Sequence, residues 1–413
     1  MEPLWQQCCW SARKVDNGLV NRGSGHGRGG VNLPALRGYN EALMLDLLRG
    51  AGPAGLGRAE LATRTGLTPQ AVSKITARLG ADGLIAEAGR AASTGGKPRT
   101  LLRLVPQARH AAGVHVDRDE LRAVRVDLAG RVVGECRGPL DFGAGPEAVV
   151  EAVVRAVARV ADPVGLPLLG VGVVAPGPLD HRAGTMGRVT GFPSWKGFPL
   201  RGVLQGRLGL PVLLDKDTNA GAAAAAGAWL RATWPDADAD ADGDAGLVAG
   251  AAGGVPDAYG YAGGGPRTCV YLHVGTGLGA GLWLGGGVYR GARSAAGEFG
   301  HQVLLMDGPP CRCGARGCVE VLCLGAVARG DLPEAARILG EAAANLVALL
   351  DVDRVLLGGR VVEAAPDVFV AGVGAVLAAR ALDPARPVVA LAGAGVAEGA
   401  AELALGPVFG RAE

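Results

Sequence analysis

The sequence is short of long apolar runs and of aromatic side chains. It has no uninterrupted apolar stretch of about 18 residues or more, which a membrane-spanning helix would need. Its N-terminus also lacks the compact apolar segment and small-residue cleavage site of a secretory signal. We therefore expect a cytoplasmic protein without a membrane partner. Aromatic residues make up only 4% of the chain, so the core must be packed mainly by aliphatic side chains.

Charge is divided unevenly along the 413 residues, which are enough for several domains. Residues 1–107 carry 14 Lys and Arg against 7 Asp and Glu, so within a net charge of +2 the remainder of the chain sums to −5. A basic segment followed by a mildly acidic one is typical of a nucleic-acid-binding domain joined to a second domain. A basic solvated face would give the same count, so motifs must decide between the two.

The first third of the chain has the pattern of a small helical domain with a hairpin. Residues 1–31 have no hydrophobic period and many glycines, and we interpret them as a disordered tail. An amphipathic helix starts at Tyr39, a short helix follows at 58–66, and a third at 68–83 opens with Thr68 as N-cap and Pro69 as first helical residue. Strands at 84–89 and 98–105 suit a β-hairpin. This order predicts a winged helix-turn-helix over residues 32–107.

A winged helix-turn-helix places its third helix in the major groove and its hairpin wing on the backbone or in the minor groove. The sequence then predicts DNA contacts from four helix residues and two wing residues: Thr68, Gln70, Ser73, Lys74, Lys97 and Arg99. The alternative is a three-helix core that binds nothing. Helix-turn-helix proteins usually read paired half-sites, so we expect a homodimer or higher homo-oligomer on a DNA operator.

Residues 108–413 alternate strands with helices, which predicts an α/β body with a mixed sheet. A strand at 209–217 runs straight into a helix at 218–232, and another strand restarts the pattern at residue 268. Between them, residues 235–267 consist of Asp-Ala and Gly runs, which indicate a solvated low-complexity insertion. A helix at 334–350 and a strand at 352–359 follow.

The segment EFGHQVLLMDGPPCRCGARGCVE, residues 298–320, concentrates cysteine in a chain with only six histidines. Its ligand set, His301, Cys311, Cys313 and Cys318, suits a tetrahedral structural Zn²⁺ with no open position left for metal catalysis. The clustering of the eight cysteines favours a metal site in a reducing compartment over a disulfide framework. The alternative is a set of buried, unligated cysteines. Cys323 falls outside the spacing, and we predict that it is a core residue.

Residues 295–320, AAGEFGHQVLLMDGPPCRCGARGCVE, resemble the signature of the ROK family, which comprises bacterial repressors and sugar kinases. The resemblance extends from about residue 32 to 360 and includes the winged helix-turn-helix typical of the repressor branch. It implies that residues 108–413 form an actin-like (ribonuclease H-like) two-lobed ATPase fold that serves as a sugar sensor. It also implies that the zinc loop shapes one wall of the sugar pocket.

The resemblance implies a defect in the first phosphate loop. Family kinases carry Asp-x-Gly-Gly-Thr there, where glycine amides close around phosphate oxygens. In this chain His115 replaces the acid, Asp117 and Arg118 replace the glycines, and Asp119 replaces the threonine. Carboxylates in that loop would repel a nucleotide, so phosphoryl transfer is not expected. The second turn, GTGLGAG at 275–281, is retained, but one glycine-rich turn is a weak signal and the two loops must cooperate.

The sugar pocket implied by the resemblance is only partly retained. Asp217 matches the catalytic base, vestigial in a regulator, while Glu298, His301 and Glu320 match other sugar contacts.

Two pocket positions depart from the family pattern, because Lys216 and Gly191 stand where asparagines are usual. Lys216 either reads an acidic sugar or pairs with Asp217, and the pairing is slightly preferred. The chain also reaches its next helix early after Glu320, as if part of a helical hairpin were deleted.

We therefore expect a DNA-binding transcriptional regulator of carbohydrate metabolism, a repressor rather than an enzyme. A sugar or sugar derivative would close the cleft, and the linker near residues 104–110 would pass that change to the DNA-binding domain. The first alternative is an ATP-dependent sugar kinase with an accessory domain. A second is a DNA-binding protein that no longer responds to a ligand.

Overall fold

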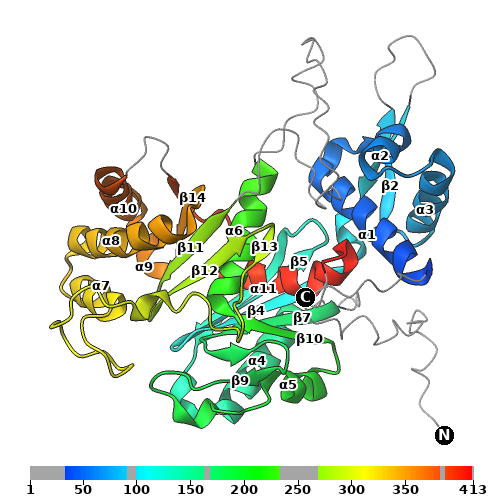
Figure 1. Cartoon of the computed structure of the whole chain (residues 1–413). Helices are drawn as coiled ribbons and strands as arrows, with labels where there is room; N and C mark the ends of the chain where they lie inside the picture. Colours follow the sequence, from blue (N-terminus) through cyan, green and yellow to red (C-terminus); the bar gives the residue numbers. More distant parts are fainter. Residues whose placement is uncertain (1–32, 91–98, 162–167, 233–267, 382–386, 412–413) are drawn as a thin grey trace, which may run out of the picture.

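The computed structural model describes residues 33–90, 99–161, 168–232, 268–381 and 387–411. Residues 33–90 and 99–104 form the part of the protein that we call the head, and the residues that follow form the body. The head contains three α-helices and a three-stranded antiparallel sheet in the order β1-β3-β2. Its elements are α1 (Leu33–Ala51), β1 (Leu56–Gly57), α2 (Arg58–Thr65), α3 (Pro69–Ala81), β2 (Ile85–Arg90) and β3 (Thr100–Leu104). Gly66 ends α2 in the left-handed region at φ 67°, so the chain can turn directly into α3. The head therefore has the element order of a winged helix-turn-helix (Figure 1).

The body holds two five-stranded mixed sheets of matching topology. The sheet of the first lobe has the order β10-β7-β4-β5-β6, with β10, β7 and β4 parallel. Its strands are β4 (His110–Val116), β5 (Glu120–Asp127), β6 (Val132–Pro139), β7 (Leu168–Ala175) and β10 (Val212–Lys216). Helices α4 (Pro146–Val160) and α5 (Leu200–Leu208) cover one face of it, and the short pair β8 (Leu179–Asp180) and β9 (Thr185–Met186) follows β7.

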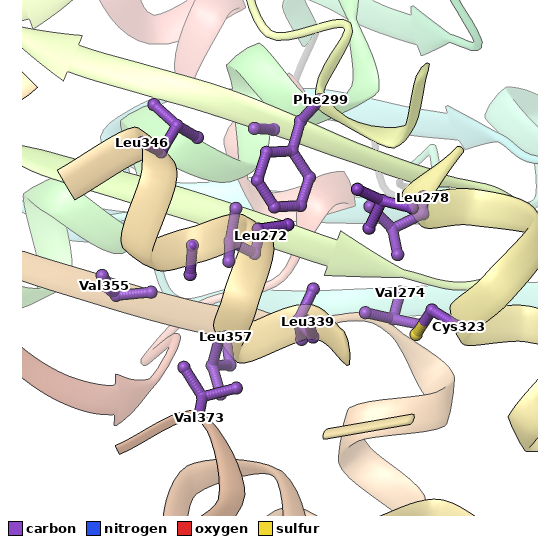
Figure 2. Close-up of a cluster of buried hydrophobic side chains, with 14 of the residues drawn as sticks. Leu272, Val274, Leu278, Phe299, Cys323, Leu339, Leu346, Val355, Leu357 and Val373 are labelled. Atoms are coloured by element: carbon purple, nitrogen blue, oxygen red, sulfur yellow. The ribbon is translucent and has the colours of Figure 1, made fainter. Parts of the chain in front are cut away.

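The sheet of the second lobe repeats this arrangement with the order β13-β12-β11-β14-β15. Its strands are β11 (Cys269–Val274), β12 (Leu278–Leu284), β13 (Gly287–Val288), β14 (Arg354–Gly358) and β15 (Val388–Leu391). One face packs on α7 (Val319–Ala328), α8 (Leu332–Leu350) and α10 (Pro366–Arg380), while α9 (Arg360–Ala364) follows β14. Figure 2 shows this core, in which Leu272, Leu339 and Leu357 are fully buried and aliphatic side chains predominate.

Two helices fill the layer between the lobes. Helix α6 (Asp217–Ala232) packs on the second sheet, α11 (Val396–Leu405) packs on the first, and the two pack against each other. Glycine permits this close approach, because a Cβ on Gly172 would lie 1.7 Å from the Ala400 carbonyl oxygen and one on Gly113 would lie 2.1 Å from that of Ala397. The last helix of the chain is thus built into the centre of the body (Figure 1).

The head and the body share one hydrophobic cluster. It joins α1 residues such as Leu48 with Val124 of the first lobe and with Phe409 of the 3-10 helix η8 (Gly406–Phe409). Arg49 of α1 donates a hydrogen bond through Nη1 to Glu402 Oε2 at 2.9 Å, and only 2% of its side chain is exposed. The contact between the head and α11 is therefore both apolar and ionic.

Most of the predicted organisation is confirmed. The body is α/β with two lobes, Thr68 caps α3 by accepting a hydrogen bond from the Ala71 amide at 3.3 Å, and Cys323 is fully buried. The prediction that the first helix starts at Tyr39 is wrong, since α1 starts at Leu33. The predicted tail at 1–31 and the predicted insertion at 235–267 lie outside the described residues. Among the described residues, no helix is both long enough and apolar enough to cross a membrane.

Candidate functional site

A cleft between the lobes collects most of the predicted pocket residues. It lies at the carboxyl ends of the parallel strands of both sheets, where open α/β folds usually place ligands. Five predicted contacts line it: Lys216, Asp217, Glu298, His301 and Glu320. Asp217 opens α6 directly after β10, whereas Glu320 lies in the first turn of α7 and accepts a hydrogen bond from the Leu278 amide at 3.0 Å. Residues from three separate segments of the chain thus converge on one space.

The acid at the base of the cleft has an altered ionisation. Burial raises the pKa of Asp217 to about 7, and the charge of Asp117 adds to the effect, although Lys216 and the Thr218 amide oppose it. A carboxyl group with this pKa is close to half protonated at neutral pH. It can either accept or donate a hydrogen bond to a hydroxyl group of a ligand.

The preferred interpretation of Lys216 is wrong. Its ammonium group does not pair with Asp217 but donates to the Ala296 carbonyl oxygen at 2.5 Å and contacts Glu298 Oε1 at 3.5 Å. Lys216 ends β10 and Asp217 starts α6, and both side chains line the cleft, but the hydrogen bond and the ion pair of Lys216 go to residues 296 and 298. The Lys216 side chain is 4% exposed, and its charge balances a carboxylate on the opposite lobe.

The cysteine-rich loop brings its four predicted ligands together. One ligand atom from each of His301, Cys311, Cys313 and Cys318 lies within 4.8 Å of all the others. His301 Nδ1 is 3.8 Å from Cys311 Sγ, and Cys313 Sγ is 3.7 Å from Cys318 Sγ. Gly314 and Gly317 have φ values of 98° and 62°, which allow the tight backbone between these sulfurs. His301 also lines the cleft, so this group could hold a metal ion directly behind the pocket wall.

The predicted DNA-contact residues of α3 all point outward. Thr68, Gln70, Ser73 and Lys74 are exposed, whereas Val72, Ile75 and Leu79 on the other face of α3 are buried in the head. Arg99, beside the hairpin, is also exposed, and Lys97 lies outside the described residues. The helix therefore presents one polar face to solvent, as a recognition helix does.

The departures from a kinase phosphate loop lie around the turn between β4 and β5, at the edge of the cleft. Asp117 and Arg118 form the turn between β4 and β5 and line the cleft. Asp119 is exposed and pairs with Arg360 of the second lobe at 2.7 Å. His115 is inside, and burial, with a smaller effect from His273, lowers its pKa to about 4, so its ring is neutral at neutral pH. Gly191 adopts φ 85°, beside the cleft-lining Thr190.

Comparisons with known proteins agree on one family. A model of the ROK family matches residues 257–404. These residues carry a ROK family domain. The xylose repressor of Bacillus spizizenii (strain ATCC 23059 / NRRL B-14472 / W23) is 26% identical over 287 residues, 68% of this chain and 65% of that protein. The chain thus spans just under two thirds of that relative's length.

Two solved structures extend the likeness to the fold. A ROK family transcriptional regulator, described as a homolog of the E. coli MLC protein, is 18% identical with a TM-score of 0.66 and covers 91% of this chain and 98% of its own. The ROK hexokinase from Thermus thermophilus is 28% identical with a TM-score of 0.50 and covers 71% of this chain and 96% of its own. The body therefore has the actin-like two-lobed fold, and the regulator's greater coverage of this chain indicates that the likeness in fold extends beyond the body.

Sequence reasoning missed two links between the lobes. Buried Asp215 forms an ion pair with Arg290 at 2.7 Å, and His181 Nδ1 lies 2.6 Å from Ser294 Oγ. Each pair joins the first lobe to the loop after β13, 75 or more residues further along the chain. No local pattern marks such partners, because each is an ordinary polar residue until the fold brings the two lobes together.

Proposed function

We propose that this chain is a DNA-binding transcriptional repressor of carbohydrate metabolism that senses a sugar or sugar derivative in its cleft. One observation carries the proposal: a head with an exposed polar recognition helix shares its core with a two-lobed body that holds a polar cleft. Repression and sugar dependence are supported by the similarity to a protein named xylose repressor.

The cleft suits a polyhydroxylated ligand. Asp217, Glu298 and Glu320 offer carboxylate acceptors, and His301 offers a ring nitrogen. Proteins usually recognise a small polar ligand with a few polar groups that converge on one pocket. In a sugar site each such group bonds to a hydroxyl and so fixes the orientation of the sugar. A ligand that contacts both lobes would bind the closed arrangement of the lobes more tightly than the open one. This difference in affinity would shift the protein toward the closed arrangement and so change the position of the head.

We propose that the group His301, Cys311, Cys313 and Cys318 holds one structural Zn²⁺. Three sulfurs and one imidazole are a tetrahedral zinc set with no open position. Burial and the sulfurs of Cys313 and Cys311 raise the pKa of Cys318 to about 12, so its thiolate requires a neighbouring cation. The metal would fix the His301 ring in the pocket wall, and it would supply structure rather than catalysis.

An ATP-dependent sugar kinase is the second candidate. The pKa of about 7 for Asp217 favours it, because a general base works best when its pKa is near the working pH. Against it, Asp117 and Arg118 occupy the turn that a nucleotide phosphate would need. We therefore place this chain among regulators that bind a ligand without phosphorylating it, acting as homodimers on paired operator half-sites in the cytoplasm.

DNA selection with the full-length protein tests the proposal. We expect it to enrich one duplex sequence with two half-sites from a random library, and Gln70→Ala with Lys74→Ala to abolish this enrichment. Neutral, amino and acidic sugars are then added to the bound DNA. At least one should release it from the wild type but not from Glu298→Ala, which keeps the head unchanged.

Failure to enrich any sequence would refute DNA recognition. Enrichment that no sugar changes would instead favour a protein that no longer responds to a ligand. A coupled assay with ATP, Mg²⁺ and the same sugars measures sugar phosphorylation and so distinguishes a kinase from a regulator. Steady turnover that Asp217→Ala abolishes would replace the regulator by the kinase.

A further inference from the structure

The turn between β4 and β5 reaches across the cleft and bonds to the glycine-rich turn of the other lobe. Asp117 Oδ1 accepts a hydrogen bond from the Thr276 hydroxyl at 2.6 Å and another from the Arg118 backbone amide at 2.7 Å. One donor comes from each lobe. A hydroxyl and a backbone amide from two facing turns are the donors that a phosphate oxygen attracts.

The space above the glycine-rich turn is filled by the side chain that follows Asp117. Arg118 donates from Nη1 to the Thr276 carbonyl oxygen at 3.2 Å. The Arg118 guanidinium fills the space beside Gly277, because a Cβ atom on Gly277 would lie only 3.0 Å from Arg118 Nη2. In the same way, a Cβ on Gly275 would be 2.8 Å from His273 Nε2. The hollow that these glycines leave for a ligand is therefore occupied by the chain's own side chains.

The ionisation of Asp117 agrees with an anion held by donors. Burial alone would raise the pKa of Asp117, but hydrogen bonds from the Thr276 hydroxyl and the Arg118 amide hold it below its usual value. The carboxylate is thus charged at neutral pH although it is mostly buried. A buried anion persists only where hydrogen bonds or charges compensate it.

A second link lies at the outer edge of the same turn. Asp119 pairs with Arg360 at the start of α9, and both side chains are about half exposed. Such an exposed pair contributes little by itself, on the order of 0–1 kcal/mol. It nevertheless leaves three consecutive residues of the first lobe, 117 to 119, all bonded to the second lobe.

We propose that the Asp117 carboxylate takes the place of a nucleotide phosphate in this cleft, linking the two lobes and excluding phosphate-bearing ligands. The end of the cleft at Asp117 and Thr276 is then closed by the chain's own side chains. Only the end lined by Asp217 and Glu298 is open to a ligand. The inference goes beyond the proposed function, because it depends on neither DNA nor sugar. It also predicts that a phosphate group can enter once the carboxylate is removed, since the Thr276 hydroxyl and the Arg118 backbone amide would then lose their acceptor.

Calorimetric titration of the full chain with inorganic phosphate, at constant ionic strength, tests this. An intramolecular carboxylate competes at millimolar effective concentration or above, so we expect Asp117→Ala to bind phosphate at least about tenfold more tightly than the wild type. Asp119→Ala is the matched control. It removes the same charge from the same turn but leaves Asp117 bonded to Thr276 and Arg118, and it should behave as the wild type.

Asp117→Asn, which keeps the side-chain shape, serves if the alanine variant fails to fold. Equal phosphate affinity in the wild type and in folded Asp117 variants would overturn the proposal, as would an equal gain in Asp119→Ala. Adding Thr276→Val to Asp117→Ala should remove the gained binding, because the hydroxyl donor is lost. Absence of DNA binding in the selection experiment would leave these results untouched, so the two proposals fail separately.

Discussion

Replacing Asp217 by asparagine should stabilise the protein, and more so as the pH rises. The carboxyl group has its pKa raised from 3.8 to about 7 by burial, so the folded chain binds a proton that the unfolded chain has lost. Well below the unfolded pKa of 3.8 both states are protonated, and the pH-dependent difference between the two variants should vanish. Between these two pKa values the wild type loses stability with each rise in pH, and above about pH 7 the penalty stays constant.

The expected size follows from the two pKa values. Their separation corresponds to ~4 kcal/mol at 1.36 kcal/mol for each pH unit. Because Asp217 lines a cleft open to water, we discount this by about half, to ~2 kcal/mol. From about pH 5 to pH 8 the advantage of Asp217→Asn should then grow by ~1 kcal/mol.

Urea unfolding of both variants at a series of pH values measures this. The informative quantity is the difference in unfolding free energy between the variants at each pH. Other titrating groups, including the cysteines of the metal loop, are common to both variants and cancel in that difference. A difference that stays flat, or that shrinks as the pH rises, would refute the assignment of a raised pKa to Asp217.

Three further outcomes are expected. Purified protein should contain close to one zinc per chain by elemental analysis, and Cys311→Ser should lose it, while full retention in that variant would remove Cys311 from the ligand set. Removing Lys97 and Arg99 together should make the slope of log K against log salt shallower by roughly one to two, at about 0.9 for each phosphate contact, and an unchanged slope would place the contacts elsewhere. Glu402→Ala leaves the Arg49 guanidinium buried beside Phe409 with weakened compensation. It should cost on the order of 3 kcal/mol and expose the head to limited proteolysis, whereas wild-type resistance would show that this pair does not hold the head.

The features that could be predicted from sequence are those encoded in short segments. The N-cap Thr68 and its helix, and the four candidate metal ligands within residues 301–318, depend on local spacing, which the sequence displays directly. The family resemblance placed Asp217 and Glu298 in one pocket, and the cleft contains both. Arg49 and Glu402, in contrast, are 353 positions apart, so no local pattern connects them. Lys216 was misassigned because its sequence neighbour was taken as its partner, although its hydrogen bond and ion pair go to residues 296 and 298.

The position of α11 has a consequence for synthesis. Ribosomes make the chain from its N-terminus, yet the buried face of α1 and the inner face of the first sheet are completed by α11 and η8, which follow α1 only after more than 300 further residues. Until then Leu48, Val124 and their neighbours have no cover from the C-terminal segment. A chain that ended before α11 would carry all of α3 on a head with an open core, exposed to chaperones and proteases. The order of elements along the chain thus makes a properly supported head depend on residues that are made long after it.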